Sequence, residues 1–450
     1  MFQSINPYTL EKVYEVKEFD KSEVEKAIDR ADERYNFWRE TSLKKRAKLM
    51  YAAATELRKN STDYATAITD EMGKPITQAL AEVEKCALVC EYYAENAEEH
   101  LRTKIIETEA TQSYVRYDPI GVVLAVMPWN YPLWQVFRFA APALMAGNVG
   151  LLKHASNVMK CADNIERVFK NAGFPEGCFT NLPIRSSMVE DIIRNEKVKA
   201  VTLTGSELAG KSVASIAGSE IKKSVLELGG SNALVIFDDC NLDETVKVCV
   251  NSRFQNAGQS CIAGKRLLVQ ASIVEKFTEN FLSGVKSLKP GNPLEMDTTI
   301  GTMARIDLAE ELEEKLKLTL KQGGKLLTGG VRKNAYFEPT VVANVTESMS
   351  IFTDETFGPL IGITVFKDED EAIKLANISR YGLGTSIFSE DMEKIMRIIP
   401  QLDDGSVFVN ELVKSDPRLP FGGTKLSGYG RELSIDGIQE FVNKKTVFIR

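Results

Sequence analysis

One cysteine of the chain stands in a setting that suits a nucleophile. Cys261 lies in the stretch NSRFQNAGQSCIAGKR, residues 251–266, with glycines and small polar residues on both sides. A cysteine attacks as a thiolate, so it needs an accessible place, nearby amides or a cation, and a partner that manages protons. An isolated cysteine is more often a small buried apolar residue. The local sequence therefore makes Cys261 a candidate nucleophile that requires support from other residues.

Two residues elsewhere in the chain could give that support. Glu227 ends a predicted strand in the sequence SVLELGGS, and its apolar neighbours should raise the pKa of its carboxyl group, as a general base near neutral pH requires. The alternative is a surface glutamate paired with a lysine. Asn130 lies where a strand ends and a helix begins, so its side chain can cap that helix or offer its NH₂ group to a developing oxyanion.

The helix expected after Asn130 carries an arginine. Trp134 and Arg138 follow Asn130 at successive intervals of four residues, so the three side chains would share one helical face. An arginine on an otherwise apolar face needs an anion. That anion is either a carboxylate of the protein or the acidic end of a substrate.

A glycine-rich segment offers a competing interpretation. The sequence GSELAGKS, Gly205–Ser212, matches the phosphate-loop pattern G-x-x-x-x-G-K-[ST] and follows a predicted strand. It raises the alternative of a phosphate-loop nucleotidase, with an acidic strand end at 233–239 for magnesium. In either case, a glycine turn that opens a helix after a strand places amides and the positive end of the helix dipole at a phosphate. The pyrophosphate of a dinucleotide would suit the same geometry.

The composition favours an enzyme that acts on small molecules. Hydrophobic residues make up 44% of the 450 and charged residues 26%, and the net charge of −7 is spread without a basic cluster that would attract nucleic acid or a membrane. With two histidines, His100 and His154, and no CxxC pair, a metal site lacks ligands and none is expected. Unpatterned cysteines and the missing secretion signal predict a cytoplasmic protein. The apolar segment 119–152 is interrupted by prolines and is expected to be buried core.

The order of the predicted elements indicates an α/β fold. Residues 1 to about 105 are expected to be helical, with a capping box at Ser22 and Glu25 and a long helix after Pro75. Short apolar strands then alternate with helices, which predicts two parallel-sheet, Rossmann-like domains. The strands are expected near 122–127, 149–153, 178–182, 198–204 and 224–228, and then near 233–237, 267–269, 361–366, 385–388 and 407–409. A ribbon strand at 112–117 could pair with the tail, 444–450, or with another subunit.

Taken together, the motifs of the chain resemble those of the aldehyde dehydrogenase superfamily from end to end. Within it, the pattern is most similar to bacterial succinate-semialdehyde dehydrogenases. The resemblance rests on the order and spacing of PWN at 128–130, LLKHAS at 151–156, LTGS at 203–206, LELGG at 226–230, GQSC at 258–261, ETFGP at 355–359 and PFGGTKLSGYGRE at 420–432.

The resemblance implies a role for each candidate residue. Cys261 would add to an aldehyde, and the oxyanion of the resulting thiohemiacetal would be held by Asn130 and the Cys261 backbone N–H. Hydride would leave for a nicotinamide, and water activated by Glu227 would hydrolyse the thioester. The residues implied in cofactor binding are Trp129, Lys153, Ser156, Gly205, Ser206, Glu355 and Phe357. The phosphate-loop match would then be accidental.

Two residues depart from the family pattern, and the second bears on the choice of cofactor. His154 stands where the family usually has proline, and we assign it no catalytic task. Ser156 stands where strictly NAD-dependent members commonly carry glutamate, whose carboxylate grips the 2′-hydroxyl and repels a 2′-phosphate. Serine does neither, so NADP is the expected cofactor, with use of NAD left open.

The resemblance also implies the substrate residues and the domains. Arg138 and Ser415, with Trp134 and Ser260 as neighbours, would bind the far carboxylate of a short semialdehyde such as succinic semialdehyde. An aldehyde dehydrogenase of different substrate preference is the alternative. Residues 1–108 and 122–228 would form the NAD(P)-binding domain, 229–413 the catalytic domain, and 109–121 with 430–450 an oligomerisation ribbon and tail. A homodimer or homotetramer is expected.

Overall fold

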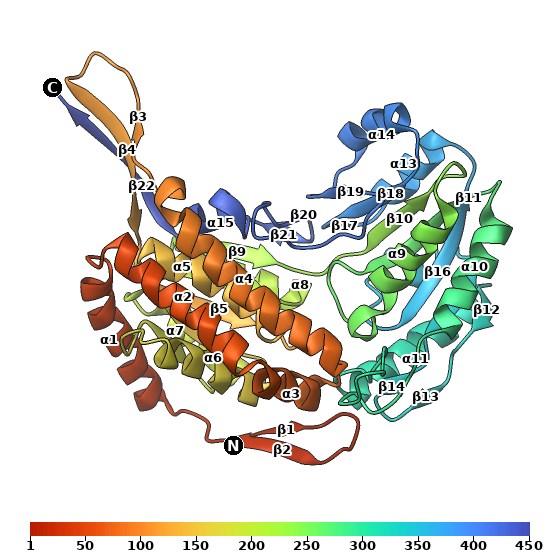
Figure 1. Cartoon of the computed structure of the whole chain (residues 1–450), viewed down its shortest axis with the longest axis horizontal. Coiled ribbons are helices and arrows are strands. Elements are labelled where there is room, and N and C mark those ends of the chain that lie inside the picture. The colour runs from red at the N-terminus through yellow and green to blue at the C-terminus, as the bar shows by residue number, and fades with distance from the viewer.

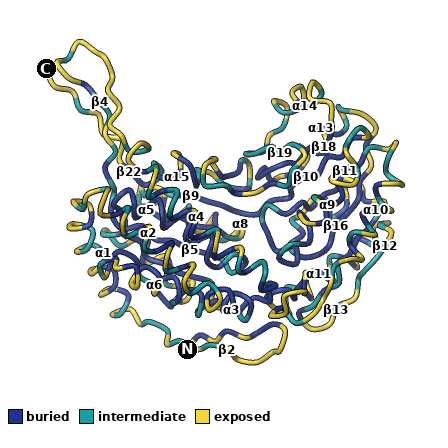
Figure 2. The backbone as a smooth tube through the Cα atoms, viewed as in Figure 1, coloured by how far each residue is buried: buried dark blue, intermediate teal, exposed yellow.

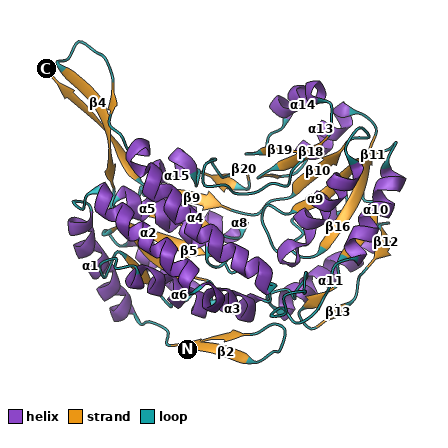
Figure 3. Cartoon of the chain, viewed as in Figure 1, coloured by secondary structure: helices purple, strands orange, loops and turns teal.

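Two sheets, each covered by helices, carry the chain's functional loops, as the computed structural model of all 450 residues shows (Figures 1 and 3). The first sheet has the strand order β21-β9-β8-β5-β6-β7 and is parallel except for β21 at one edge. Its strands are β5 (Val122–Met127), β6 (Val149–His154), β7 (Phe179–Asn181), β8 (Val198–Thr204), β9 (Lys223–Glu227) and β21 (Gly428–Tyr429). The predicted strands of this sheet are confirmed to within a residue or two.

Helices from the first half of the chain cover this sheet. Each brings an apolar face to one continuous core of 73 buried hydrophobic residues. The helices are α1 (Lys21–Trp38), α2 (Leu43–Lys59), α3 (Ser61–Met72), α4 (Ile76–His100), α5 (Trp134–Ala146), α6 (Met159–Asn171), α7 (Val189–Arg194) and α8 (Glu207–Ser219). Every residue of α5 is buried, as expected for the apolar segment. No helix in the structure has both the length and the apolar character needed to cross a membrane.

The N-terminal region differs from the prediction in two ways. It is not helical throughout, because β1 (Phe2–Ile5) and β2 (Lys12–Val16) form an antiparallel hairpin against the first domain. The predicted position of the capping box is also wrong by two residues. Asp20 accepts a hydrogen bond from the Glu23 amide at 2.9 Å, and Glu23 accepts one from the Asp20 amide at 2.8 Å. Ser22 already lies inside the helix, so it cannot be the N-cap residue.

The second domain is built on a seven-stranded sheet of order β12-β15-β16-β11-β10-β18-β19. Its strands are β10 (Asn232–Ile236), β11 (Gly264–Gln270), β12 (Lys325–Thr328), β15 (Thr340–Ala343), β16 (Leu360–Phe366), β18 (Thr385–Phe388) and β19 (Val407–Val409). Only β12 and β15 were not predicted. They are short, and β12 is a half-exposed edge strand without a continuous apolar run.

Helices pack on both faces of the second sheet over two smaller cores. They are α9 (Leu242–Phe254), α10 (Val274–Lys286), α11 (Ile306–Lys321), α12 (Ser350–Thr353), α13 (Glu369–Asn377) and α14 (Met392–Ile398). Two short antiparallel pairs complete the domain. They are the hairpin of β13 (Arg332–Lys333) with β14 (Tyr336–Phe337), and the long-range pair of β17 (Tyr381–Gly382) with β20 (Thr424–Lys425).

A ribbon extends from the first domain. After α15 (Ser434–Glu440), β22 (Val442–Ile449) pairs antiparallel with β4 (Gln112–Pro119), and β3 (Lys104–Ile105) adds a third strand. The predicted pairing of the tail with the earlier ribbon strand is therefore confirmed. The ribbon projects from the body and most of its residues are exposed (Figures 1 and 2).

Candidate active site

The edge of the first sheet gathers three of the predicted segments. Strands β5, β8 and β9 run parallel, so Asn130 and Gly205, which follow β5 and β8, and Glu227, which ends β9, lie at the same end of the sheet. Ligands of such sheets bind beyond the carboxyl ends of the strands. The second domain brings the Cys261 loop to this same edge.

The Cys261 loop is held in an unusual backbone conformation. Helix α9 ends at Phe254, and a 3₁₀ turn, η2 (Gln255–Gly258), follows. Asn256, Ala257 and Gly258 have φ values of 53°, 50° and 70°, a region that L-residues seldom adopt. A Cβ atom on Gly258 would lie 2.4 Å from the Gly358 carbonyl oxygen, so no side chain fits there.

Buried Arg253 holds this loop in place through hydrogen bonds to backbone carbonyl groups. Its guanidinium group donates hydrogen bonds to the carbonyl oxygens of Gly258 at 2.9 Å, Gly264 at 3.1 Å and Thr356 at 3.2 Å, and also bonds that of Gly358. Burial lowers the pKa of Arg253 to about 9, against its usual 12.5. The carbonyl contacts satisfy the donors of its two terminal nitrogens, whereas its Nε has no partner. Arg253 thus joins the nucleophile loop to the segment that contains Thr356 and Gly358.

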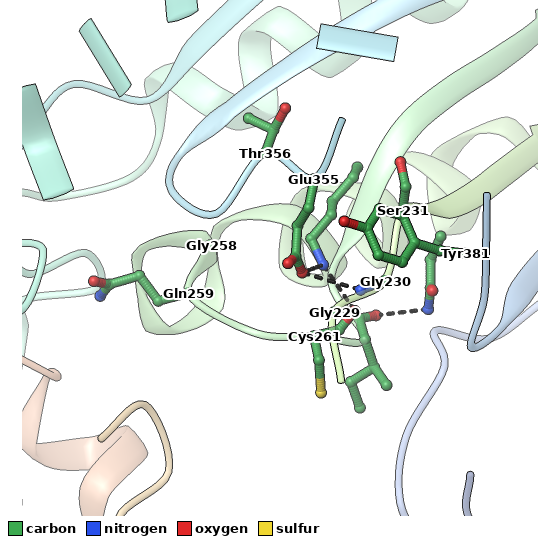
Figure 4. Close-up of polar contacts among 12 residues, drawn as sticks. Gly229, Gly230, Ser231, Gly258, Gln259, Cys261, Glu355, Thr356 and Tyr381 are labelled. Atoms are coloured by element: carbon green, nitrogen blue, oxygen red, sulfur yellow. Dashed lines mark hydrogen bonds and ion pairs between the residues drawn. The ribbon is translucent and has the colours of Figure 1, made fainter. Parts of the chain in front are cut away.

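The thiol itself lies in a partly dry setting. Cys261 is half-buried, and burial raises the pKa of its thiol above the usual value, while the charges of Arg138 and Lys265 act in the opposite direction. Fully buried Lys265 donates to the Cys261 carbonyl at 2.7 Å and to Glu355 at 2.9 Å. The thiol is therefore mainly protonated at neutral pH, and its attack requires loss of that proton. Figure 4 shows the sulfur pointing away from the Glu355 carboxylate.

Asn130 does not cap the helix that follows it. The Asn130 Nδ2 donates to the Gln259 carbonyl at 3.1 Å, and its Oδ1 accepts from Gln135 Nε2 at 3.2 Å. The first amides of α5, those of Leu133 and Trp134, instead donate to Glu82 at 2.9 and 3.0 Å. The capping alternative is therefore wrong, and the Asn130 NH₂ group lies beside the nucleophile loop.

A buried ion pair holds the Asn130 turn in place. Lys74 and Glu82 form an ion pair with side chains 1% and 2% exposed, and Lys74 also donates to the Asn130 carbonyl at 3.1 Å. A second bond to that carbonyl comes from Asn256 at 2.8 Å. Neither Lys74 nor Glu82 was among the predicted site residues. One signal existed for Glu82, which lies on the buried face of α4 beside Ala79, Val83 and Cys86.

Glu227 is buried and not a surface residue. Neither carboxyl oxygen has a hydrogen-bond partner. Burial, and then the charge of Glu432, raises the pKa of Glu227 well above its usual value, as predicted, while Arg138 and Arg431 act in the opposite direction. A Cβ on Gly422 would lie 2.8 Å from Glu227 Oε1, so the Pro420–Gly423 segment packs directly on the carboxylate.

Two cavities meet at Cys261. One has a volume of about 220 Å³, and the other about 250 Å³. Cys261 and Gln135 line both. Trp134, Arg138, Ser260 and Ser415 line the first, and Trp129, Gly205, Ser206, Glu355 and Phe357 line the second. The thiol thus has access to two separate ligand spaces. Glu227 lines neither, so its carboxylate must turn to reach the sulfur.

The second cavity suits a dinucleotide. Ser206 caps α8 by accepting from the Ala209 amide at 3.3 Å, which leaves a helix N-terminus beside the cavity. Glu355 bonds Lys265 and the Gly230 amide through Oε1, and its Oε2 fills the space left by the missing side chain of Gly229. The Phe357 ring packs edge-on against Trp129 at 5.7 Å. These groups offer a phosphate site, a hydroxyl acceptor and an apolar wall.

Two predicted cofactor residues lie at the end of β6. Lys153 is buried, and burial lowers the pKa of its ammonium group, whereas Ser156 is exposed. Between them His154 is fully buried, and burial lowers its pKa to about 4. Neutral His154 accepts from the Ala155 amide at 2.9 Å and donates to the Pro132 carbonyl at 2.8 Å. It therefore supports the turn after β5, in keeping with a structural task.

The phosphate-loop alternative is wrong. Helix α8 begins at Glu207, so residues 207–210 are helical and cannot wrap around a phosphate chain as a loop. Lys211 lies on the surface of this helix and pairs with Glu207 at 2.5 Å. The segment therefore matches the phosphate-loop motif in sequence but not in backbone conformation.

Arg138 has a partner within the protein. Its guanidinium group forms an ion pair with Glu432, contacts Thr204 Oγ1 at 3.4 Å and lies over the Phe421 ring at 4.5 Å. Arg138 is 2% exposed. The first of the two anions considered for it, a protein carboxylate, is therefore present, although the side chain still lines the first cavity.

Comparisons with known proteins agree with this geometry. Residues 1–447 match the model of the aldehyde dehydrogenase family. The chain is 46% identical over 450 residues to a probable succinate-semialdehyde dehydrogenase [NADP(+)] of Synechocystis sp., covering 99% of both chains. It is 43% identical over 448 residues to the succinate semialdehyde dehydrogenase [NAD(P)+] of Escherichia coli, covering 99% of this chain and 97% of that one.

Solved structures agree as well. The crystal structure of succinic semialdehyde dehydrogenase from Streptococcus pyogenes in complex with NADP+ superposes with a TM-score of 0.97 at 37% identity, with both chains fully covered. Nearly complete coverage in sequence and structure, together with a cysteine set between two cavities at the edge of a parallel sheet, leaves one conclusion. The chain belongs to the aldehyde dehydrogenase family.

Proposed function

We propose that this protein oxidises succinic semialdehyde to succinate, with NADP as the hydride acceptor. The observation that supports this most is the position of Cys261 at the junction of two cavities, one lined by cationic side chains and the other suited to a dinucleotide. The relatives named above as NADP-dependent succinate-semialdehyde dehydrogenases give the same substrate and cofactor.

The chemistry follows from the residues around the thiol. The Cys261 thiol loses its proton to water, and the thiolate sulfur adds to the aldehyde carbon. The oxygen that becomes negative is held by the Asn130 NH₂ group and the Cys261 backbone N–H. NADP, when bound, accepts the hydride of the resulting thiohemiacetal. Glu227 then takes a proton from a water molecule that attacks the thioester carbon, which releases the acid and restores the thiol.

Residues of the second cavity would hold the cofactor. We propose that Ser206 and Gly205 lie at the pyrophosphate, Glu355 at the nicotinamide ribose, and Trp129 and Phe357 beside the ring. At the other end, Lys153 and Ser156 would face the adenosine ribose. Lys153 forms no ion pair with a protein carboxylate, and Ser156 adds no negative charge.

A glutamate at position 156 should shift the cofactor preference. The variant Ser156→Glu would place a carboxylate where the 2′-phosphate of NADP is expected, so kcat/KM with NADP should fall about 10- to 100-fold through repulsion and desolvation, while kcat/KM with NAD is kept or rises. Parallel initial-rate measurements with both cofactors check this. Ser156→Ala is the matched control and should change the ratio only slightly. An unchanged ratio in Ser156→Glu would contradict the assignment.

The proposed substrate is tested against a neutral aldehyde of the same length. With NADP, kcat/KM for succinic semialdehyde should exceed that for butanal by at least about tenfold, because only the former carries a carboxylate for the cationic cavity. Formation of NADPH is followed at 340 nm. Equal values for the two aldehydes would leave an aldehyde dehydrogenase of another preference.

We further propose a cytoplasmic homodimer or homotetramer assembled through the ribbon. Ile105, Phe448 and Ile449 on β3 and β22 are 79%, 50% and 44% exposed. Apolar side chains on a projecting strand favour pairing with a second copy.

A further inference from the structure

The first cavity contains more positive charge than its known partners neutralise. Its charged lining residues are Lys74, Glu82, Lys85, Arg138 and Lys414. Three of the four cations have a carboxylate partner, since Lys74 pairs with Glu82, Arg138 with Glu432, and Lys414 with Glu411 at 2.8 Å. Lys85 forms no ion pair. One positive charge of this cavity is therefore free for an anion from outside.

Lys85 is held in a defined position. It lies on α4, and its Nζ donates to Ser415 Oγ at 2.8 Å. Trp134 Nε1 donates to the same oxygen at 3.0 Å, and the Lys85 Nζ lies 4.2 Å from the centroid of the Trp134 ring. Three elements, α4, α5 and the loop before β20, thus converge on one hydroxyl group. A lysine ammonium has three N–H donors, so at least one remains for a ligand.

We propose that Lys85 binds the distal carboxylate of the substrate and is the main source of the preference for an acidic aldehyde. This inference rests on the proposed function and refines it. Arg138 lines the same cavity, but its charge is shared with Glu432. Ser415, which accepts from both Lys85 and Trp134, can turn its own O–H to the same carboxylate. The carboxylate would then meet an ammonium, a hydroxyl and an indole ring that line the same cavity as Cys261.

The surroundings of Lys85 also predict a pH dependence. Burial, and then the charge of Arg138 on α5, lowers the pKa of Lys85 to about 8, while Cys86 and Glu82 on α4 and Asp416 beyond Ser415 act in the opposite direction. Lysine is charged below its pKa, so the cavity loses this cation as the pH rises through about 8. The KM for succinic semialdehyde should rise over that range, and the KM for butanal should not.

The decisive experiment replaces Lys85 by methionine, which keeps most of the length and removes the charge. In Lys85→Met the KM for succinic semialdehyde should rise about 10- to 100-fold, while kcat and the KM for butanal change less than about threefold. Binding of succinate, measured by calorimetry, should weaken by the same factor. Lys85→Arg should recover most of both losses. Lys48→Met, which removes an exposed lysine from the neighbouring α2, is the matched control and should behave as the wild type.

The outcomes separate this inference from the proposed function. If the wild type does not prefer succinic semialdehyde over butanal, the proposed substrate fails first. If that preference exists and survives in Lys85→Met, only the role of Lys85 is overturned. Equal losses on both aldehydes would also overturn it, because they would indicate a structural task. Arg138→Met in the same assays should reduce turnover of both aldehydes, since its charge also acts on Cys261 and Glu227.

Discussion

Replacing Cys261 by alanine should abolish the formation of NADPH from succinic semialdehyde. Without the sulfur no covalent thiohemiacetal forms. Gln135 is the other residue that lines both cavities, and its amide is not a nucleophile. The loss in kcat should be about 10⁴-fold or more, the scale on which removal of a catalytic nucleophile acts. Absorbance at 340 nm, followed over hours at high enzyme concentration, sets the limit.

Two controls make that result specific. Cys240→Ala removes the other half-buried cysteine, which lies outside both cavities, and should retain wild-type activity. Cys261→Ala should still bind NADP with a similar dissociation constant, because the residues proposed to hold the cofactor are unchanged. Residual turnover within about tenfold of the wild type would contradict a covalent mechanism.

Much of the framework could be predicted because it depends on local sequence. Strands β5, β8 and β10 are short apolar runs set between helices, a pattern typical of a sheet buried on both faces. The parallel arrangement of β5, β8 and β9 then places Asn130 and Glu227 at the same end of the first sheet. The N-terminal hairpin was missed because its strands are short and partly exposed, with little apolar pattern to distinguish them.

The charge partners of the site could not be predicted in this way. Arg138 pairs with Glu432, and Lys85 meets Ser415, each across about three hundred residues of sequence. Sequence spacing indicated only that a buried arginine needs an anion. Which of the nearby carboxylates supplies it depends on how the Pro420–Glu432 segment returns to the first domain. The same return explains why Lys85, an ordinary lysine of a helix in the sequence, lies in the cavity.

Replacing Glu227 by glutamine should slow the later step of the reaction, hydrolysis of the thioester. The variant Glu227→Gln keeps the shape of the side chain but cannot accept a proton from water, so hydrolysis of the thioester should slow about 10²- to 10⁴-fold. Attack by Cys261 and transfer of hydride precede that step. Stopped-flow absorbance at 340 nm should therefore show a rapid burst of about one NADPH per active site, followed by a slow steady rate.

The raised pKa of Glu227 gives this test a second readout. A base acts only when ionised, so the steady-state rate of the wild type should rise with pH through the raised pKa of Glu227, and this rise should vanish in Glu227→Gln. Stability should show the opposite trend. Because the folded state raises this pKa, it favours the protonated carboxyl, and the wild type loses unfolding free energy as the pH rises through that pKa.

Glutamine has no charge to bury, so Glu227→Gln should be at least as stable as the wild type at alkaline pH. Its loss of turnover therefore cannot come from unfolding. A variant that shows no burst and loses both steps equally would instead place Glu227 in the attack of the thiol. Because this carboxylate packs against Gly422 and lines neither cavity in the structure, it must move toward Cys261 before it acts. A substitution that makes the Pro420–Gly423 segment less flexible should then slow hydrolysis of the thioester and leave the burst of NADPH unchanged.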